Sequence, residues 1–192
     1  GSSWTAGGNL NTARVNHAGC GLQTAGLCFG GYTGTNINST EEYDGSSWTA
    51  GGNLNTARRS FGGAGLQTAG LAFGGYTTAV SNSTEEYDGS SWTAGGNLNT
   101  ARNALDGSGI QTAALCFGGR TPPPYSSATE KYDGSSWTAQ PNMATARQNL
   151  TGAGTQSAAL AFGGENPDNT GVTEEYNITA MTVTAGAWAS GG

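Results

Sequence analysis

The segment EEYDGSSWTAGGNLNTAR, residues 41–58, recurs along the chain and constrains the fold more than any other feature. It returns almost unchanged as residues 85–102 and with several changes as residues 130–147. Its second half opens the chain, and its first half returns near residue 174. The tryptophans Trp4, Trp48, Trp92 and Trp137 are therefore 44, 44 and 45 residues apart. A fixed period of this length predicts stacked copies of one supersecondary unit.

Units of about 44 residues are too small to bury separate cores, so we expect a single domain over residues 1–192. The unit boundaries fall near residues 14–57, 58–101, 102–146 and 147–192, with residues 1–13 left over as a candidate closing strand. Glycine makes up 34 of the 192 residues, far above the usual share of roughly 7%. These glycines recur beside aromatic residues, which indicates turns and close backbone approach rather than disorder.

Each unit reads as four short strands. In the second unit, two runs at residues 60–65 and 68–75 are joined by a tight turn at Leu66-Gln67. After a polar loop, a third strand at 84–88 turns at Asp88-Gly89 into a fourth at 90–94. Apolar residues do not recur at helical spacing over any useful window. The pattern predicts a four-stranded antiparallel meander.

The combination of motifs in each unit is similar to the kelch repeat. Glycine pairs end the second strand at 30–31, 74–75, 118–119 and 163–164, a tyrosine lies in the third strand (Tyr43, Tyr87, Tyr132, Tyr176), a tryptophan in the fourth, and an arginine opens the next unit. The resemblance covers nearly the whole chain, and it implies the blades of a β-propeller. The Asp-Gly-Ser-Ser-Trp segment is also weakly similar to the Asp-box of sialidases, but that motif has one more residue between Asp and Gly, so we disfavour it.

We therefore expect an all-β chain, a β-propeller of four-stranded antiparallel blades built from four kelch-like repeats. A closed four-bladed ring is the favoured arrangement, and membership in a larger ring is the alternative. In the closed ring, Gly1 to Leu10 supplies the fourth strand of the last blade. Met181 to Trp188 (MTVTAGAW) also alternates and competes for that place.

Columns that stay constant between units are interpreted as architecture. An invariant glutamate shares a strand face with the tyrosine, whereas the next column admits Lys131 and is therefore expected to face water. A buried arginine needs a carboxylate or carbonyls, so we expect Arg–Glu or Arg–carbonyl contacts inside the blades. An arginine cluster for acidic sugars, and tryptophans for sugar stacking, are the functional alternatives. The structural residues are Arg14, Arg58, Arg102, Arg147, Glu41, Glu85, Glu130, Glu174, Trp4, Trp48, Trp92 and Trp137.

Charge and cysteine content narrow the class of partner. The net charge is −6, with one lysine among seven basic residues, which disfavours a nucleic-acid surface. No apolar run approaches the ~18 residues of a membrane helix, so we expect no membrane insertion. Cys20, Cys28 and Cys116 occupy positions filled by small residues in other units, and we interpret them as buried packing residues.

The inventory of reactive groups disfavours an enzyme. His17 is the one histidine, which excludes a multi-histidine metal site. Adjacent carboxylates such as Glu41-Glu42 point to opposite faces of a strand and cannot act as a pair. The acidic segments lack the ligand spacing of a calcium loop. We expect no catalytic residues, no metal and no cofactor.

Two segments differ between the copies, and both are expected at one rim of the ring. One opens the first strand of each unit, and the other is the loop after the glycine pair. Loops on a rigid scaffold commonly carry recognition, and the kelch resemblance similarly implies partner binding there; drift of unconstrained loops is the alternative. The candidate binding residues are Asn16, His17, Tyr32, Asn36, Arg59, Phe61, Tyr76, Asp106, Arg120, Tyr125, Glu165 and Asp168.

Three functions follow in order of preference. The first is a non-enzymatic propeller that binds a glycan or a protein through its loop face, as an extracellular, cell-surface or virion-surface adhesin. The second is a structural spacer that assembles with other chains of a larger particle. The third is an enzyme with a site in the central channel.

Overall fold

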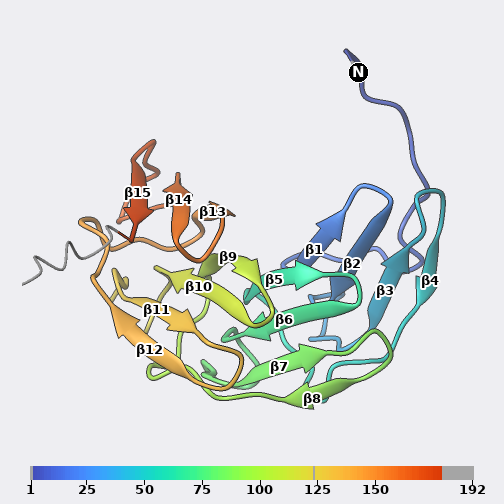
Figure 1. Cartoon of the computed structure of the whole chain (residues 1–192), viewed down its shortest axis with the longest axis horizontal. Coiled ribbons are helices and arrows are strands. Elements are labelled where there is room, and N and C mark those ends of the chain that lie inside the picture. The colour runs from blue at the N-terminus through green and yellow to red at the C-terminus, as the bar shows by residue number, and fades with distance from the viewer. Residues whose placement is uncertain (1, 123, 179–192) are drawn as a thin grey trace, which may run out of the picture.

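The computed structural model describes residues 2–122 and 124–178, and it is all-β. Four antiparallel sheets follow one another along the chain and surround one axis, as the blades of a four-bladed β-propeller (Figure 1). Blade 1 contains β1 (Ala18–Leu22), β2 (Ala25–Phe29), β3 (Thr40–Tyr43) and β4 (Trp48–Ala50). Blade 2 contains β5 (Gly62–Leu66), β6 (Ala69–Phe73), β7 (Thr84–Tyr87) and β8 (Trp92–Ala94). Blade 3 contains β9 (Asp106–Ile110), β10 (Ala113–Phe117), β11 (Thr129–Tyr132) and β12 (Trp137–Gln140).

Blade 4 has three strands among the described residues: β13 (Thr151–Gly154), β14 (Ala158–Phe162) and β15 (Thr173–Asn177). Residues 2–10 form no strand, so the expected closing strand is not made by this part of the chain. Instead, they lead away from blade 1 (Figure 1), and Trp4 is 102% exposed. The structural role predicted for Trp4 is therefore corrected. The competing segment Met181 to Trp188 lies outside the described residues.

The strands within a blade form a simple meander, as the sequence predicts. In blade 2, Leu66 pairs with Ala69, so the two-residue turn is Gln67-Thr68, one residue later than expected. The Gln67 side chain explains this placement, because its Nε2 donates to Tyr43 O (2.7 Å) and Gly26 O (3.1 Å) of blade 1. The turn thus also ties one blade to the blade before it.

The core lies between the blades. Trp92 of blade 2 packs on Phe29 of blade 1 with ring centroids 4.8 Å apart, and on Tyr87 at 5.0 Å. Its indole Nε1 donates to Thr40 Oγ1 at 3.0 Å. A buried tryptophan removes on the order of 150–250 Å² from water. Trp137 repeats the arrangement one blade further on, so each inner junction is held by the same apolar contacts.

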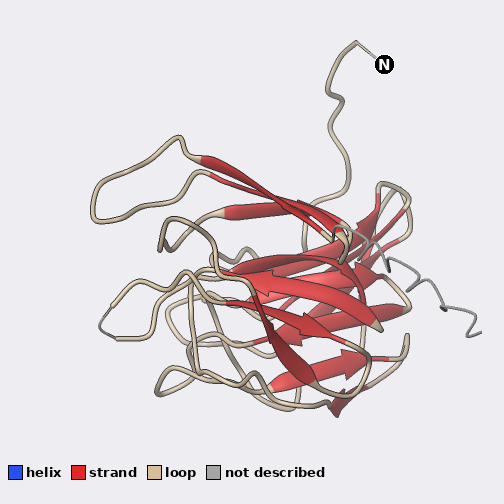
Figure 2. Ribbon diagram, turned by 60° about the vertical axis from the view of Figure 1, so that its left-hand side comes forward, coloured by secondary structure: helices blue, strands red, loops and turns tan. Residues whose placement is uncertain are grey.

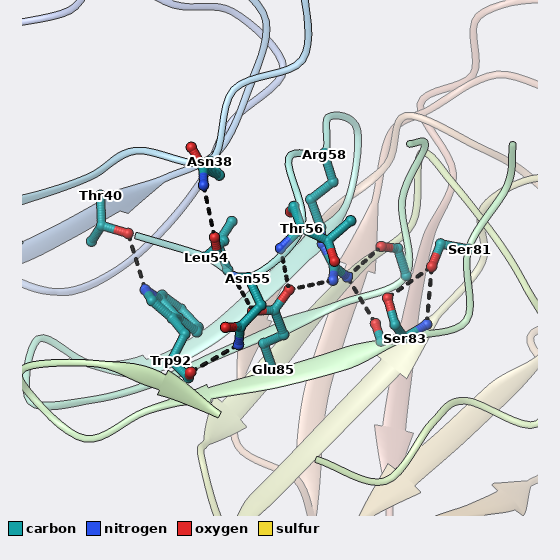
Figure 3. Close-up of polar contacts among 11 residues, drawn as sticks. Asn38, Thr40, Leu54, Asn55, Thr56, Arg58, Ser81, Ser83, Glu85 and Trp92 are labelled. Carbon is teal, nitrogen blue, oxygen red and sulfur yellow. Dashed lines mark hydrogen bonds and ion pairs between the residues drawn. The ribbon is translucent and has the colours of Figure 1, made fainter. Parts of the chain in front are cut away.

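The invariant arginines and glutamates form the predicted pairs inside the blades. Arg58 Nη2 donates to Glu85 Oε1 at 2.6 Å, and Arg58 Nη1 donates to the carbonyl oxygens of Ser83 and Gly74 (Figure 3). Glu85 also accepts from the backbone N–H of Asn55 at 2.6 Å. A buried ion pair is tolerated when further hydrogen bonds satisfy both groups, and that condition is met here. The other three pairs are Arg14–Glu41, Arg102–Glu130 and Arg147–Glu174, at 2.5, 2.8 and 2.9 Å.

The neighbouring glutamate column is not simply a wet surface, which corrects the expectation from Lys131. Tyr87 donates its hydroxyl to Glu42 of the preceding blade at 2.5 Å, and Tyr132 does the same to Glu86. Lys131 cannot accept such a bond, and in blade 4 the hydroxyl of Tyr176 instead donates to Gln140 at 3.0 Å. The change from Glu to Lys is compensated by a glutamine from the neighbouring strand.

The cysteines lie where the sequence places them. Cys28 and Cys116 are buried, and Cys20 is half-buried. In the described part of the chain, no helix has the length and apolar character needed to cross a membrane.

Candidate functional site

The two variable segments of each unit meet at one rim of the propeller. Behind each glycine pair, the first loop residue forms a β-bridge with the residue that opens the first strand. The glycines allow this because their φ angles are positive, as at Gly74 (70°) and Gly75 (98°). Figure 2 shows the longer loops projecting at one end of the strands. The bridged pairs are Val15–Tyr32, Arg59–Tyr76, Asn103–Arg120 and Gln148–Glu165.

Arg59 is the centre of a polar and aromatic cluster that joins the rims of blades 1 and 2. Its guanidinium carbon lies 4.7 Å from the ring centroid of Tyr32 and 4.8 Å from that of Tyr76. Its Nη1 also donates to Asn36 Oδ1 at 3.1 Å. Asn36 Nδ2 in turn donates to the carbonyl oxygen of Thr77 at 2.5 Å. The five residues thus hold one another, and we call them the Arg59 cluster.

The Arg59 cluster presents chemistry suited to recognition. Two tyrosine rings, one guanidinium and one amide are fixed on loops that are anchored by rigid sheets. No described residue forms a hydrogen bond with the hydroxyl of Tyr32 or Tyr76, so both hydroxyls are available to a ligand. Cation–π contacts of this kind hold an arginine in place at a cost that water alone would not repay. The cluster is therefore preorganised, which reduces the entropy lost on binding.

Blades 3 and 4 carry different side chains at the same rim. Arg120 is exposed and forms a bridge with Tyr125. In blade 4, the amide of Gln148 donates to the carboxylate of Glu165, and Asp168 is exposed in the loop. Arginine and tyrosine are also present in blade 3, but no cation–π contact joins them among the described residues. The structure brings together Tyr32, Asn36, Arg59 and Tyr76 and leaves the other rim residues apart.

Three of the predicted binding residues line the central channel instead. Asn16, His17 and Asp106 border a cavity of about 370 Å³ around the axis, to which all four blades contribute. The pKa of His17 is lowered by partial burial and by the charge of Arg14. Burial raises the pKa of Asp106 to about 6, while the N–H of Gly152, which donates to its Oδ2 at 2.8 Å, opposes the shift.

The channel wall is a run of hydrogen bonds between blades. Ser60 donates its N–H to Asn16 O at 2.9 Å, Ala104 to Ser60 O at 2.7 Å, and Asn149 to Ala104 O at 2.9 Å. Each of these four residues has a positive φ of 52–54°, which is uncommon outside glycine. The strained backbone aims the N–H and the carbonyl at the neighbouring blades. The strain therefore serves the junctions, and the sequence gave no signal of it.

Phe61 corrects the predicted binding set. It is 5% exposed and packs on Phe29 with ring centroids 5.7 Å apart, so it belongs to the core rather than to the rim. The same column holds Leu105 and Leu150, which are equally buried. The apolar character of three members out of four was the available signal. His17 is the exception, since it is exposed at the end of the array.

The described residues contain no group of three or more histidine, cysteine, aspartate or glutamate side chains placed to hold a metal ion. No protein-family model matches the chain, and no curated protein sequence matches it. The propeller fold and the rim geometry are therefore the observations on which a function must be argued.

Proposed function

We propose that this protein is a non-enzymatic binding propeller of the kelch type, which recognises a glycan or a protein through its loop rim. The Arg59 cluster carries the proposal, because it is a preorganised set of aromatic, cationic and amide groups that spans two blades. Rigid tyrosines supply contact area at low entropic cost, and asparagine and serine supply hydrogen bonds. The acidic chain, with a net charge of −6, also agrees with a partner that is not a nucleic acid.

The position of the cluster supports recognition rather than a purely architectural role. The blades are already joined by the Trp92 packing and the Arg58–Glu85 pair. The rim contact is present at one junction, whereas architectural contacts repeat at every inner junction. A function on the surface of a cell or a virion, as an adhesin, is the setting in which such a repeat protein would use its rim.

A glycan array tests the proposal directly. We expect the full chain to bind a subset of glycans, and the triple variant Tyr32→Ala, Arg59→Ala, Tyr76→Ala to lose at least roughly 10-fold in affinity. The matched control is Thr24→Ala with Thr68→Ala, which alters exposed turn residues at the opposite rim. Circular dichroism verifies that both variants keep the fold. Binding that survives in the triple variant would contradict the proposal, and an array without bound glycan would leave a protein as the ligand class.

A structural assembly module is the second candidate, and it has its own observation. The outer face of blade 4 exposes apolar surface that is buried in the inner blades, with Phe162 at 36% against 0% for Phe29 and Phe73. Such a surface suits contact with another chain. The two functions are compatible because the rim and the blade faces are separate surfaces.

A further inference from the structure

A cavity of about 260 Å³ lies between blades 3 and 4, beside the free edge of β15. Its wall includes Phe117, Thr129 and Tyr176, with Leu115, Met143 and Ala159 closing the apolar side. The cavity is lined from both blades, so it belongs to their junction. It is the place where the blade 3–blade 4 junction differs from the two junctions before it.

The walls of this cavity match the surroundings of the buried tryptophans. Trp92 contacts Phe29 and Tyr87 and donates to Thr40. Trp137 contacts Phe73 at 5.1 Å and Tyr132 at 4.8 Å, and donates to Thr84 at 2.9 Å. One repeat further along, the equivalent residues are the three that line the cavity. The cavity therefore has the lining that accepts an indole in the two blades before it, and we call it the tryptophan socket.

The chain also holds an unpaired strand that would fill such a socket. Ser2 to Ala6 reads SSWTA, identical to residues 46–50, 90–94 and 135–139 apart from position. These three segments include the fourth strands of blades 1 to 3, whereas Trp4 is fully exposed. From Asn11 onward the chain binds blade 1 as its equivalents bind blade 2, since Asn11 N–H donates to Glu41 as Asn55 N–H donates to Glu85. Only the strand itself lacks its sheet among the described residues.

A second pair of complementary surfaces flanks the strand and the socket. In the inner junctions, Gln111 Nε2 donates to Gly70 O and Tyr87 O, and Gln156 repeats this on blade 3. On blade 1, the equivalent Gln23 is exposed. On blade 4, the equivalent of the buried Phe73 is Phe162, which is 36% exposed. Blade 1 thus offers one half of a junction and blade 4 offers the other half.

The same chain does not bring these halves together. The three inner junctions share the tryptophan or socket packing, the glutamine bonds and the channel hydrogen bonds, so each applies nearly the same rotation. Three equal quarter turns would make the fourth junction without any adjustment. Yet no hydrogen bond joins Asn16 N–H to Asn149 O in the described part of the chain. Closing it within one chain would require changing three well-packed junctions.

We propose that two copies of this chain associate head to tail, with Ser2–Ala6 of one copy completing blade 4 of the other. Trp4 enters the tryptophan socket, and its Nε1 donates to Thr129 Oγ1. By the register of Tyr43 with Trp48 and of Glu42 with Thr49, Tyr176 pairs with Trp4 and Glu175 with Thr5. Blade 1 of the first copy then covers Phe162 of the second. A head-to-tail contact of this kind forms a ring when its rotation closes.

The first test is the mass of the full chain in solution, measured by light scattering over a range of concentrations. We expect a species at or above twice the chain mass of 19.2 kDa, and we expect Trp4→Ala to weaken association by roughly 30-fold or more. Thr5→Ala is the matched control, because its equivalents Thr49 and Thr93 are exposed, so it should leave association unchanged. A chain that is monomeric at all concentrations, or an association that Trp4→Ala does not weaken, overturns the proposal.

The second test separates exchange between copies from closure within one chain. Thr5→Cys and Glu175→Cys are prepared as separate proteins and mixed under mild oxidation. Because these positions lie opposite each other in the proposed pairing, a disulfide-linked heterodimer should form on mixing. The control mixture is Thr5→Cys with Glu42→Cys, since Glu42 already pairs with Thr49. A cross-link that forms only when both cysteines are in one chain, giving a monomer, overturns the proposal. Neither test depends on the ligand of the loop rim.

Discussion

Blades 2 and 3 have a neighbour on both sides, whereas blades 1 and 4 each have one free face, and the same residues behave differently in the two settings. Tyr87 and Tyr132 are 0% exposed, but Tyr43 and Tyr176 are half-buried. Trp92 and Trp137 are 4% exposed, but Trp48 is half-buried. The sequence of these columns is constant, so the difference comes from the neighbours and not from the unit itself.

This contrast shows where the stability of the molecule lies. A blade alone has a sheet with glycine and alanine on much of its surface, and its large side chains point toward the next blade. The free energy of folding is therefore held in the junctions, as expected for repeat proteins in which each unit contacts only its neighbours. Terminal units of such arrays need a partner or a polar cap, and blades 1 and 4 expose apolar residues instead.

The largest difference between inner and terminal blades should come from the buried ion pairs. Glu85→Ala leaves the guanidinium of Arg58 without its carboxylate in a fully buried site, so we expect a loss of about 3–5 kcal/mol in unfolding free energy. Glu174 has a side chain that is 19% exposed, compared with 4% for Glu85, and water can replace it in part. Glu174→Ala should therefore cost clearly less. Urea unfolding of both variants measures the difference.

The same comparison gives its own contradicting outcome. If Glu85→Ala and Glu174→Ala lose equal stability, then the free face of blade 4 is covered in solution or the pair is insensitive to burial. Measuring both variants in the presence of Trp4→Ala distinguishes these two cases, because that substitution removes the proposed cover.

The tryptophans should show a smaller difference of the same sign. Trp92→Phe removes buried apolar area and leaves the hydroxyl of Thr40 without the indole N–H, which should cost about 2 kcal/mol. Trp48 donates instead to Gly8 O at 3.2 Å at an exposed site, so Trp48→Phe should cost less than about 1 kcal/mol in dilute protein. Thermal unfolding at low concentration measures both, and an equal loss would contradict the assignment of a free blade 1 face.

The period of the repeat and the constant columns were sufficient to predict the blades, the meander and the Arg–Glu pairs. These features are local, because each depends on residues within one unit and the next. The arrangement of the fourth junction was not predictable in this way. It depends on the rotation that each junction applies, which is set by the packing of residues such as Phe29 against Trp92. A small rotation at each junction accumulates, and no single column records it.

The rim was predicted as a region, and its members were predicted less well. Phe61 was grouped with the rim because its segment varies, yet its column is apolar in three blades and belongs to the core. The Arg59 cluster could not be derived from the sequence, since Tyr32 and Arg59 come from different units and meet only when the blades are placed. The bond from Tyr87 to Glu42 was missed for the same reason.

Asp106 marks a place where one inner blade departs from the repeat, and its effect should be the smallest and depend on pH. The equivalent positions hold Ala18, Gly62 and Thr151. Because burial raises the pKa of Asp106 to about 6 from the usual 3.8, the folded protein binds a proton more tightly than the unfolded chain does. Its contribution to stability is therefore fully present below about pH 4 and declines as the pH rises toward 6.

Asp106→Asn mimics the protonated acid and should remove this decline, so that stability between pH 4 and 6 changes less than in the parent. Asp88→Asn is the matched control in the same protein. Hydrogen bonds from Ser91 and Ser90 lower the pKa of Asp88 to about 2, so its contribution is lost only as the pH falls below 4. Unfolding curves at several pH values should thus separate the two aspartates by the window in which each acts. An Asp106→Asn variant that keeps the parent's slope between pH 4 and 6 would place that carboxylate in contact with water, and the channel would then be open at the junction of blades 3 and 4.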